Sequence, residues 1–306
     1  MNPDRLLAEV RAPAYLSDAI DELLIQQRAT WPMLVEGERA LASSPARRLG
    51  EEADGIVLQA NLRRRASTFA KTDAASIEAR PCFLCEANLP DEERGVGFGD
   101  LVAMANPFPA VPDHLTLADR QHVPQLLLGR VHSLHIVAQA LGPEWFVLYN
   151  GSACGASAPD HFHLQAGRRD ALPVFSTMPS DVRSGVSVVT FGSRCGLLVR
   201  ADTDAEVTIA VEAILTALGH GREPMVNIIG TAGPDGFHTL IFPRRRHRSE
   251  AFGEPDALAI SPAALEMGGL VIIGDGEQFE GVTLPQIEAL YAEVCVSPQD
   301  VRGWGL

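Results

Sequence analysis

The sequence predicts an α+β protein of two related units, each with a mainly antiparallel sheet flanked by helices. Helix-like and strand-like segments interleave in both halves of the 306-residue chain. Many neighbouring strand-like segments are joined by short links, which favour antiparallel pairing over the parallel order of a Rossmann sheet. The polar, proline-bearing stretch Arg168–Ser184 separates the two runs of elements. We therefore expect one unit over residues 1–175 and another over residues 176–306.

The first half is expected to begin with a helical region that covers a sheet. Apolar residues recur at helical spacing over Asp18–Leu41, and Pro32 breaks the run. Pro124–Leu141 carries an apolar stripe typical of a helix packed on a core. The strand-like segments of this half are Ile56–Leu62, Leu101–Met104, Trp145–Tyr149 and His161–Ala166.

The second half repeats this order of elements. Ala205–Leu218 predicts a helix that stops at Gly219, and Leu284–Val294 predicts a closing helix. The strand-like segments of this half are Val186–Phe191, Gly196–Arg200, Met225–Ile229, His238–Phe242 and Leu270–Ile273.

The excess of acidic residues argues against some classes of binding partner. Twenty-five Lys and Arg stand against 39 Asp and Glu, a net charge of −14, and this excess argues against nucleic acids and anionic membranes as partners. No apolar run approaches the roughly 20 residues that span a bilayer. The first residues lack the basic start and apolar core of a signal peptide. We expect a soluble, cytoplasmic protein.

The segment His161-Phe-His163-Leu-Gln165-Ala166 carries the strongest chemical signal. On a strand, side chains alternate between faces, so two imidazoles and an amide would project together while apolar residues face the other way. The loop before it is rich in glycine and small residues, including Gly155 and Ser157, and its backbone N–H groups could hold an anion. A surface histidine strand behind a plain flexible loop is the alternative.

These residues resemble the histidine-triad superfamily in its transferase branch. Asn150, Gly155, Ser157, His161, His163 and Gln165 follow the order found in galactose-1-phosphate uridylyltransferases, diadenosine polyphosphate phosphorylases and GDP-hexose phosphorylases. The likeness extends to bacterial proteins that share the segments Arg80–Cys85 and Cys154–His161. Both units would then be histidine-triad-like, the second one degenerate. Hydrolases of the superfamily usually carry a third histidine at the position of Gln165, so the resemblance favours group transfer.

The resemblance also implies a nucleotide site. It makes His163 the nucleophile, and His163 and Gln165 the two catalytic residues. Asn106-Pro-Phe-Pro109 and His114 match the segment that lines the nucleotide pocket, and Gln59-x-Asn61-x-x-Arg64 resembles the base- and phosphate-facing strand of the phosphorylases. Asn150, Gly155 and Ser157 belong to the phosphate loop by the same likeness. Arg244, in the basic run after a predicted strand, is a further candidate for phosphate contact, with a solvated basic surface as the alternative.

The chemistry of such a site is coherent. A neutral imidazole can attack an α-phosphorus and form a nucleotidyl-histidine intermediate, provided that the other ring nitrogen is held by a hydrogen bond. The uncharged Gln165 amide can hold a phosphoryl oxygen as charge develops. Inorganic phosphate or a sugar phosphate would then accept the nucleotide. The expected substrate is a nucleoside diphosphate sugar or a dinucleoside polyphosphate, and a homodimer is the candidate assembly.

Five cysteines, an odd number, argue against a fully paired disulfide framework. Cys82-x-x-Cys85 is half of a tetrahedral zinc site, for which histidine is the natural supplier of the other ligands. By resemblance to zinc-bearing uridylyltransferases, the set is Cys82, Cys85, His114 and His161, with the zinc structural. A redox dithiol and two unligated thiols are the alternatives.

Two other functions remain open from the sequence. A nucleotide hydrolase would use the same His163 with water as the second nucleophile. A zinc-stabilised nucleotide-binding regulatory protein would bind without turnover.

Overall fold

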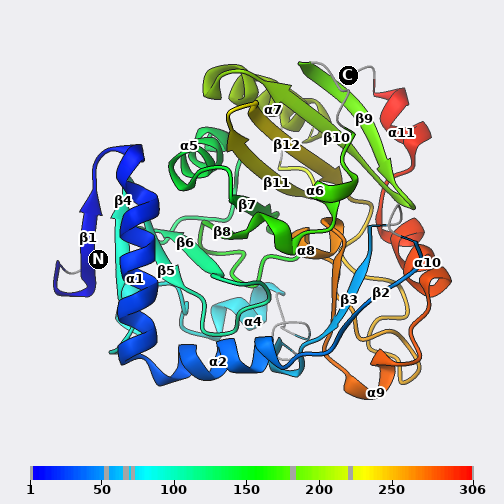
Figure 1. Ribbon diagram of the computed structural model, residues 1–306. Coiled ribbons are helices and arrows are strands. Elements are labelled where there is room, and N and C mark those ends of the chain that lie inside the picture. Colours follow the sequence, from blue (N-terminus) through cyan, green and yellow to red (C-terminus); the bar gives the residue numbers. More distant parts are fainter. Residues whose placement is uncertain are drawn as a thin grey trace.

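The computed structural model describes residues 3–51, 55–64, 69, 73–179, 184–219 and 223–304. Within these ranges, ten strands form one sheet in the order β1-β4-β5-β6-β8-β7-β11-β12-β10-β9, and a second sheet has the order β13-β3-β2 (Figure 1). All neighbours are antiparallel except the pairs β1–β4 and β13–β3. The α+β class with mainly antiparallel sheets flanked by helices is confirmed.

The strand and helix bounds agree closely with several expected segments. The strands are β1 (Leu6–Val10), β2 (Ala46–Arg48), β3 (Val57–Ala60), β4 (Gly95–Phe98), β5 (Leu101–Ala105), β6 (Leu115–Asp119), β7 (Trp145–Asn150), β8 (His163–Arg168), β9 (Gly185–Phe191), β10 (Arg194–Ala201), β11 (Val226–Gly233), β12 (Gly236–Pro243) and β13 (Leu270–Ile273). The helices are α1 (Leu16–Thr30), α2 (Pro32–Ala42), α4 (Ala74–Glu78), α5 (Val131–Leu141), α6 (Val174–Thr177), α7 (Asp204–Gly219), α8 (Ala264–Met267), α9 (Gly276–Phe279), α10 (Leu284–Val294) and α11 (Pro298–Gly303).

One expected helix is shorter than its apolar pattern suggested. The segment Pro124–Leu141 forms helix only from Val131, because residues 124–130 run as turns that bring the side chain of Gln125 to the start of β8. The break at Pro32 is real and separates α1 from α2. None of the described helices has the length and apolar character that a membrane crossing requires.

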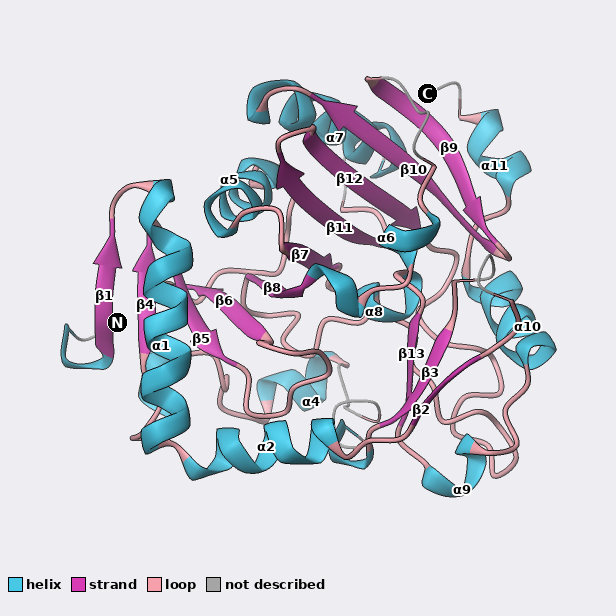
Figure 2. Cartoon of the chain, viewed as in Figure 1, coloured by secondary structure: helices cyan, strands magenta, loops and turns pink. Residues whose placement is uncertain are grey.

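The same order of elements occurs on both sides of residue 175. The run β5-β6-α5-β7-β8 is matched by β9-β10-α7-β11-β12, and the inner strands β7 and β11 pair in the middle of the sheet. The sheet is therefore continuous across the two halves. Its strands and the helices around them are distinguished in Figure 2.

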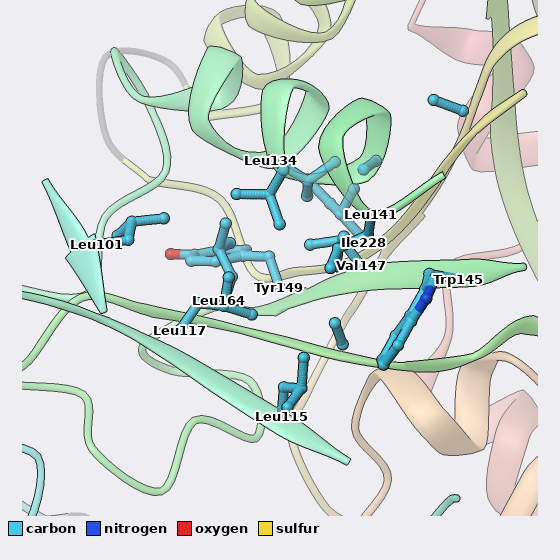
Figure 3. Close-up of a cluster of buried hydrophobic side chains, with 14 of the residues drawn as sticks. Leu101, Leu115, Leu117, Leu134, Leu141, Trp145, Val147, Tyr149, Leu164 and Ile228 are labelled. Carbon is cyan, nitrogen blue, oxygen red and sulfur yellow. The ribbon is translucent and has the colours of Figure 1, made fainter. Parts of the chain in front are cut away.

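The main hydrophobic core lies between one face of the large sheet and the helices α1, α5 and α7. Figure 3 shows Leu134 and Leu141 of α5 above Val147, Tyr149 and Leu164 of the sheet. Burial of such side chains contributes roughly 1.5–3 kcal/mol each. Because strand residues alternate, His163 and Gln165 flank Leu164 and face the opposite side of the sheet.

That opposite side is occupied differently over the two halves. Over the second half it carries another core, to which β13, α8 and α10 contribute. A smaller cluster that includes Cys82, Leu84 and Met104 lies over the first half. The parallel pair β3–β13 joins residues 57–60 to residues 270–273, so the small sheet is shared by both halves.

Candidate functional site

His163 begins β8 and is buried, with 3% of its surface exposed. Its Nδ1 lies 2.8 Å from the carbonyl oxygen of His161. A carbonyl can only accept, so Nδ1 carries the proton and Nε2 of the neutral ring keeps its lone pair. Burial lowers the pKa of His163 to about 4, although the hydrogen bond to His161 opposes this shift. The imidazole is therefore neutral at physiological pH.

The buried side chain of Gln125 holds the backbone of His163 in place. Its Oε1 accepts from His163 N at 2.7 Å, and its Nε2 donates to the carbonyls of His163 and Asn150, each at 3.0 Å. The β7–β8 pairing ends at Leu148 and Gln165, so this amide bridges the strands where the ladder stops. Gln125 was not among the predicted site residues, because it lies in the segment that the apolar pattern assigned to a helix.

Gln165 is held by His114. Nδ1 of His114 accepts from Ala110 N at 3.2 Å, so Nε2 is the protonated nitrogen and donates to Gln165 Oε1 at 2.9 Å. Burial lowers the pKa of His114 to about 3, and the nearby Arg64 adds to the effect, so the ring stays neutral. With its oxygen engaged, Gln165 has its NH₂ group left to donate.

His163 and Gln165 line a cavity of about 910 Å³ on this face of the sheet. Its wall also includes Arg64, Asn106 and Ser157. A second cavity of about 60 Å³ shares Arg64, Ser157 and Gln165 with the first, so the two meet beside Gln165. The smaller one is lined further by Asn150 and Gly155, and by His247 and Arg248 from the second half.

Five of the expected nucleotide-binding residues thus line a cavity. Asn106 fixes its own loop as well: its Nδ2 donates to Thr116 Oγ1 at 3.2 Å, and its Oδ1 accepts from Phe108 N at 2.9 Å. Arg64 donates from Nη1 to the Phe108 carbonyl at 2.9 Å. Both side chains therefore hold the proline-rich loop against the cavity.

Gly155 is required by the backbone. Its φ is +99°, and a Cβ added there would lie 2.6 Å from the Cβ of Ala263. Only glycine adopts this conformation without strain and allows so close an approach. The glycine-rich loop is thereby packed against the segment that precedes α8.

Three expected residues lie elsewhere. The Asn61 amide is buried and donates to the Pro109 carbonyl at 3.0 Å, so it holds the loop instead of lining a cavity. Gln59 on β3 is outside both cavities, and its buried Oε1 has no hydrogen-bond partner among the residues that the structure describes.

Arg244 is the third, and it does not face a cavity. It is 5% exposed, and its guanidinium donates to the side chain of Asn227 and to four backbone carbonyls, those of Val294, Pro262, Arg246 and His247. The Arg244 guanidinium, expected to contact phosphate, instead holds these protein groups together. Asn227 in turn donates to Asn150 Oδ1 at 2.9 Å, which links the two halves.

Two cysteines and two histidines gather beside the start of β8. Ligand atoms of Cys82, Cys85, His122 and His161 all lie within 4.8 Å of one another. His161 Nδ1 lies 3.3 Å from Cys82 Sγ, and His122 Nδ1 lies 3.2 Å from Cys85 Sγ. This cluster could hold a metal ion.

The outer nitrogen of His161 has an acceptor. Nε2 of His161 lies 2.8 Å from the Asp119 carbonyl, whereas Nε2 of His122 lies 3.6 Å from Asp160 Oδ2, beyond hydrogen-bond distance. The Asp119 carbonyl favours the tautomer in which Nδ1 of His161 is the ligand atom, as is usual around metal-bound histidines. Burial by itself would raise the pKa of Cys82, but the hydrogen bond with His161 is among the effects that bring it down to about 7. A thiolate is therefore accessible there.

The structure brings His122, not His114, to the cysteines. His114 immediately precedes β6, where the antiparallel register places it near Gln165. His122 follows the end of β6 and lies near the start of β8. The expected ligand His114 is thus a partner of Gln165. His161 precedes β8 and faces Cys82, so it does not share the cavity wall with His163 and Gln165 as the alternation had suggested.

Comparison with known proteins supports the fold. The family described as "Domain of unknown function (DUF4922)" matches residues 23–168, just under half of the chain. No curated protein matches the sequence.

Among solved structures, yeast Ap4A phosphorylase Apa2 aligns with a TM-score of 0.57 at 14% identity, covering 87% of this chain and 98% of that one. Its complex with Ap4A gives 0.58 at 15% identity, covering 92% and 97%. Its complex with AMP gives 0.55 at 16% identity, covering 91% and 95%. The chain shares the fold of this phosphorylase. A uridylyltransferase mutant aligns with a TM-score of 0.36 at 13% identity, covering 74% and 92%, and adds nothing to that conclusion.

Proposed function

We propose that the protein is a nucleotidyltransferase or phosphorylase that forms a covalent nucleotidyl-His163 intermediate. The expected substrate is a nucleoside diphosphate sugar or a dinucleoside polyphosphate. The observation that carries the proposal is the Nδ1 hydrogen bond to the His161 carbonyl, which leaves the nucleophilic Nε2 of a cavity-lining histidine unprotonated. The yeast phosphorylase that shares the fold is named for its action on Ap4A.

The reaction has two displacements. In the first, the Nε2 lone pair attacks the α-phosphorus, and the bond to the bridging oxygen breaks with its electron pair on the departing phosphate. In the second, an oxygen of inorganic phosphate or a sugar phosphate attacks the same phosphorus, and the bond to Nε2 breaks. Nδ1 keeps its proton throughout and donates a hydrogen bond to the His161 carbonyl, which stabilises the positive ring of the intermediate.

Gln165 would stabilise charge on the transferred phosphoryl group. Its NH₂ can donate to a non-bridging oxygen, since its own oxygen is engaged by His114. Arg64 and Ser157, at the junction of the two cavities, would supply positive charge and a hydroxyl for the phosphates. These local groups would attract an anionic ligand to a protein whose net charge is −14.

We further propose that Cys82, Cys85, His122 and His161 hold zinc. Two thiolates and two imidazoles at Cys-x-x-Cys spacing form a donor set that suits tetrahedral zinc. When bound, zinc would act structurally and fix the segment that carries His161. Because the His161 carbonyl orients His163, this site would position the nucleophile.

In this proposal residues 1–175 form the catalytic half and residues 176–306 a degenerate second half. The second half contributes His247 and Arg248 to the smaller cavity. The homodimer and the cytoplasmic location stay predictions.

The deciding experiment is intact-mass detection of a nucleotidyl adduct after incubation with ADP-, GDP- and UDP-glucose, Ap4A and Gp4G without phosphate. The proposal expects an adduct that His163→Ala abolishes and that is retained by His132→Ala, the variant of an exposed histidine. Added phosphate should then release a nucleoside diphosphate. Turnover at full rate without phosphate would identify a hydrolase, and absence of any adduct across the panel would favour a zinc-stabilised binding protein.

A further inference from the structure

A buried carboxyl group lies in the wall of the large cavity. Glu93 is 7% exposed and lines the cavity that contains His163. Its side chain makes no hydrogen bond to any residue in the described ranges. Burial raises the pKa of Glu93 to about 7, and only the nearby Arg5 opposes this shift. Arg5 directs its own donors to the Pro90 carbonyl and Asp91 Oδ1.

The backbone around Glu93 is held by a buried residue of α1. Gln27, with 0% exposure, accepts from Arg94 N at 3.0 Å and donates to the Glu92 carbonyl at 3.0 Å. Glu93 N also donates to the Pro90 carbonyl at 3.2 Å and closes a turn. The backbone that carries the carboxyl is therefore held in position, and burial of the carboxylate has an energetic cost that Arg5 offsets only in part.

The spacing between Glu93 and Gln165 suits a nucleoside. Gly95, Met104, Thr116 and Gln165 pair in one row across four adjacent strands. Three strand spacings of about 4.8 Å place Gly95, at the start of β4, roughly 14 Å from Gln165, and Glu93 lies two residues before Gly95. A nucleotide with its α-phosphate at Gln165 would direct its base toward Glu93.

The neighbouring wall fits a planar base. Met33, Leu84, Leu89 and Met104 provide apolar surface in the same cavity. Asn88 lines it too, and since its Nδ2 donates to the Cys82 carbonyl at 2.8 Å, its Oδ1 remains as an acceptor. Glu93 and the Asn88 oxygen are thus two acceptors in this wall. Of the cations that line the same cavity, Arg64 donates to the Phe108 carbonyl and Arg80 to the Ser157 carbonyl.

We propose that Glu93 selects guanine by accepting hydrogen bonds from its N1–H and N2–H. Guanine presents two adjacent donors, which match the two oxygens of a carboxylate. Adenine and cytosine offer an amino group beside a bare ring nitrogen, and uracil offers one N–H between two carbonyls, so each would leave an acceptor facing the carboxylate. This inference rests on the proposed function and names the base of its substrate.

Calorimetric titration with GMP, IMP, AMP and UMP tests the proposal. We expect GMP to bind on the order of 10- to 100-fold more tightly than AMP or UMP, the range for a bidentate base contact. IMP, which lacks the N2 amino group, should fall in between. Glu93→Gln should remove most of the preference for GMP, whereas Glu92→Gln, a change of the exposed neighbouring carboxylate, should keep it.

Equal binding of GMP and AMP, or an unchanged preference in Glu93→Gln that is folded by circular dichroism, would overturn the assignment. The adduct experiment separates the two proposals. An adenylyl or uridylyl adduct that forms as readily as the guanylyl one would refute the role of Glu93 and keep the nucleotidyl transfer. A GMP preference without any adduct would refute the nucleotidyl transfer and keep the role of Glu93.

Discussion

The carbonyl oxygen of His161 accepts a 2.8 Å hydrogen bond from Nδ1 of His163, while the ring of the same His161 lies 3.3 Å from Cys82 Sγ. One residue thus contacts both the candidate metal cluster and the candidate nucleophile. Loss of the metal should reach the reaction through this single backbone group.

Removal of either Cys85 or His122 should therefore remove the metal and slow adduct formation. Cys85→Ser and His122→Ala are expected to lower the zinc content, measured by mass spectrometry of the metal, from one per chain to near zero. The midpoint of thermal unfolding should fall by roughly 3 °C for each ~2 kcal/mol lost. For the zinc content alone, His114→Ala is the matched control; zinc loss in that variant would restore His114 as a ligand.

The contact between His114 and Gln165 should be visible in the rate. Gln165→Ala is expected to slow adduct formation by about 10²-fold, as for loss of a donor to a developing oxyanion. His114→Ala should cost less, about tenfold, because the amide is present but no longer oriented by one hydrogen bond. Single-turnover kinetics at saturating substrate measure both. An unchanged rate in His114→Ala would show that Gln165 is oriented by other contacts.

The carboxyl of Glu93 should destabilise the free protein as pH rises. Its pKa is about 7 when folded against an ordinary value of 4.5, so between these values the unfolded chain loses the proton first and stability falls. Above pH 7 both states are ionised and the full penalty, about 3 kcal/mol, remains. Glu93→Gln should be more stable than the parent at pH 8 by up to this amount and nearly equal at pH 5, as measured by urea unfolding. Equal stability at both pH values would contradict this.

Gly155 should be less replaceable than a glycine of similar φ in open space. Gly155 and Gly253 have φ of +99° and +97°, but only the former has a neighbour where a Cβ would stand. Gly253→Ala should cost about 1–3 kcal/mol from backbone strain. Gly155→Ala should cost about 1–3 kcal/mol more from the contact with Ala263. Chemical denaturation of the two variants side by side measures the difference.

The sequence predicted most elements and the strand motif, but not the partners that depend on strand register. Leu284–Val294 was predicted to the residue because its helix boundaries are local. The choice between His114 and His122 depends on the pairing of β6 with β8, and β6 lay hidden in a proline-rich segment. The burial of Arg244 depends on Asn227 and on carbonyls up to 50 residues away, which no local pattern shows.

The antiparallel contact between β7 and β11 sets what either half could do alone. A chain cut near residue 175 would leave Trp145–Asn150 with an unpaired row of backbone donors and acceptors, on a strand whose residues are all buried in the whole protein. Such an edge recruits other strands. The half containing His163 would therefore aggregate or pair with a second copy of itself. The half lacking the histidine motif prevents this, because its strand β11 covers the edge of β7 within the same chain.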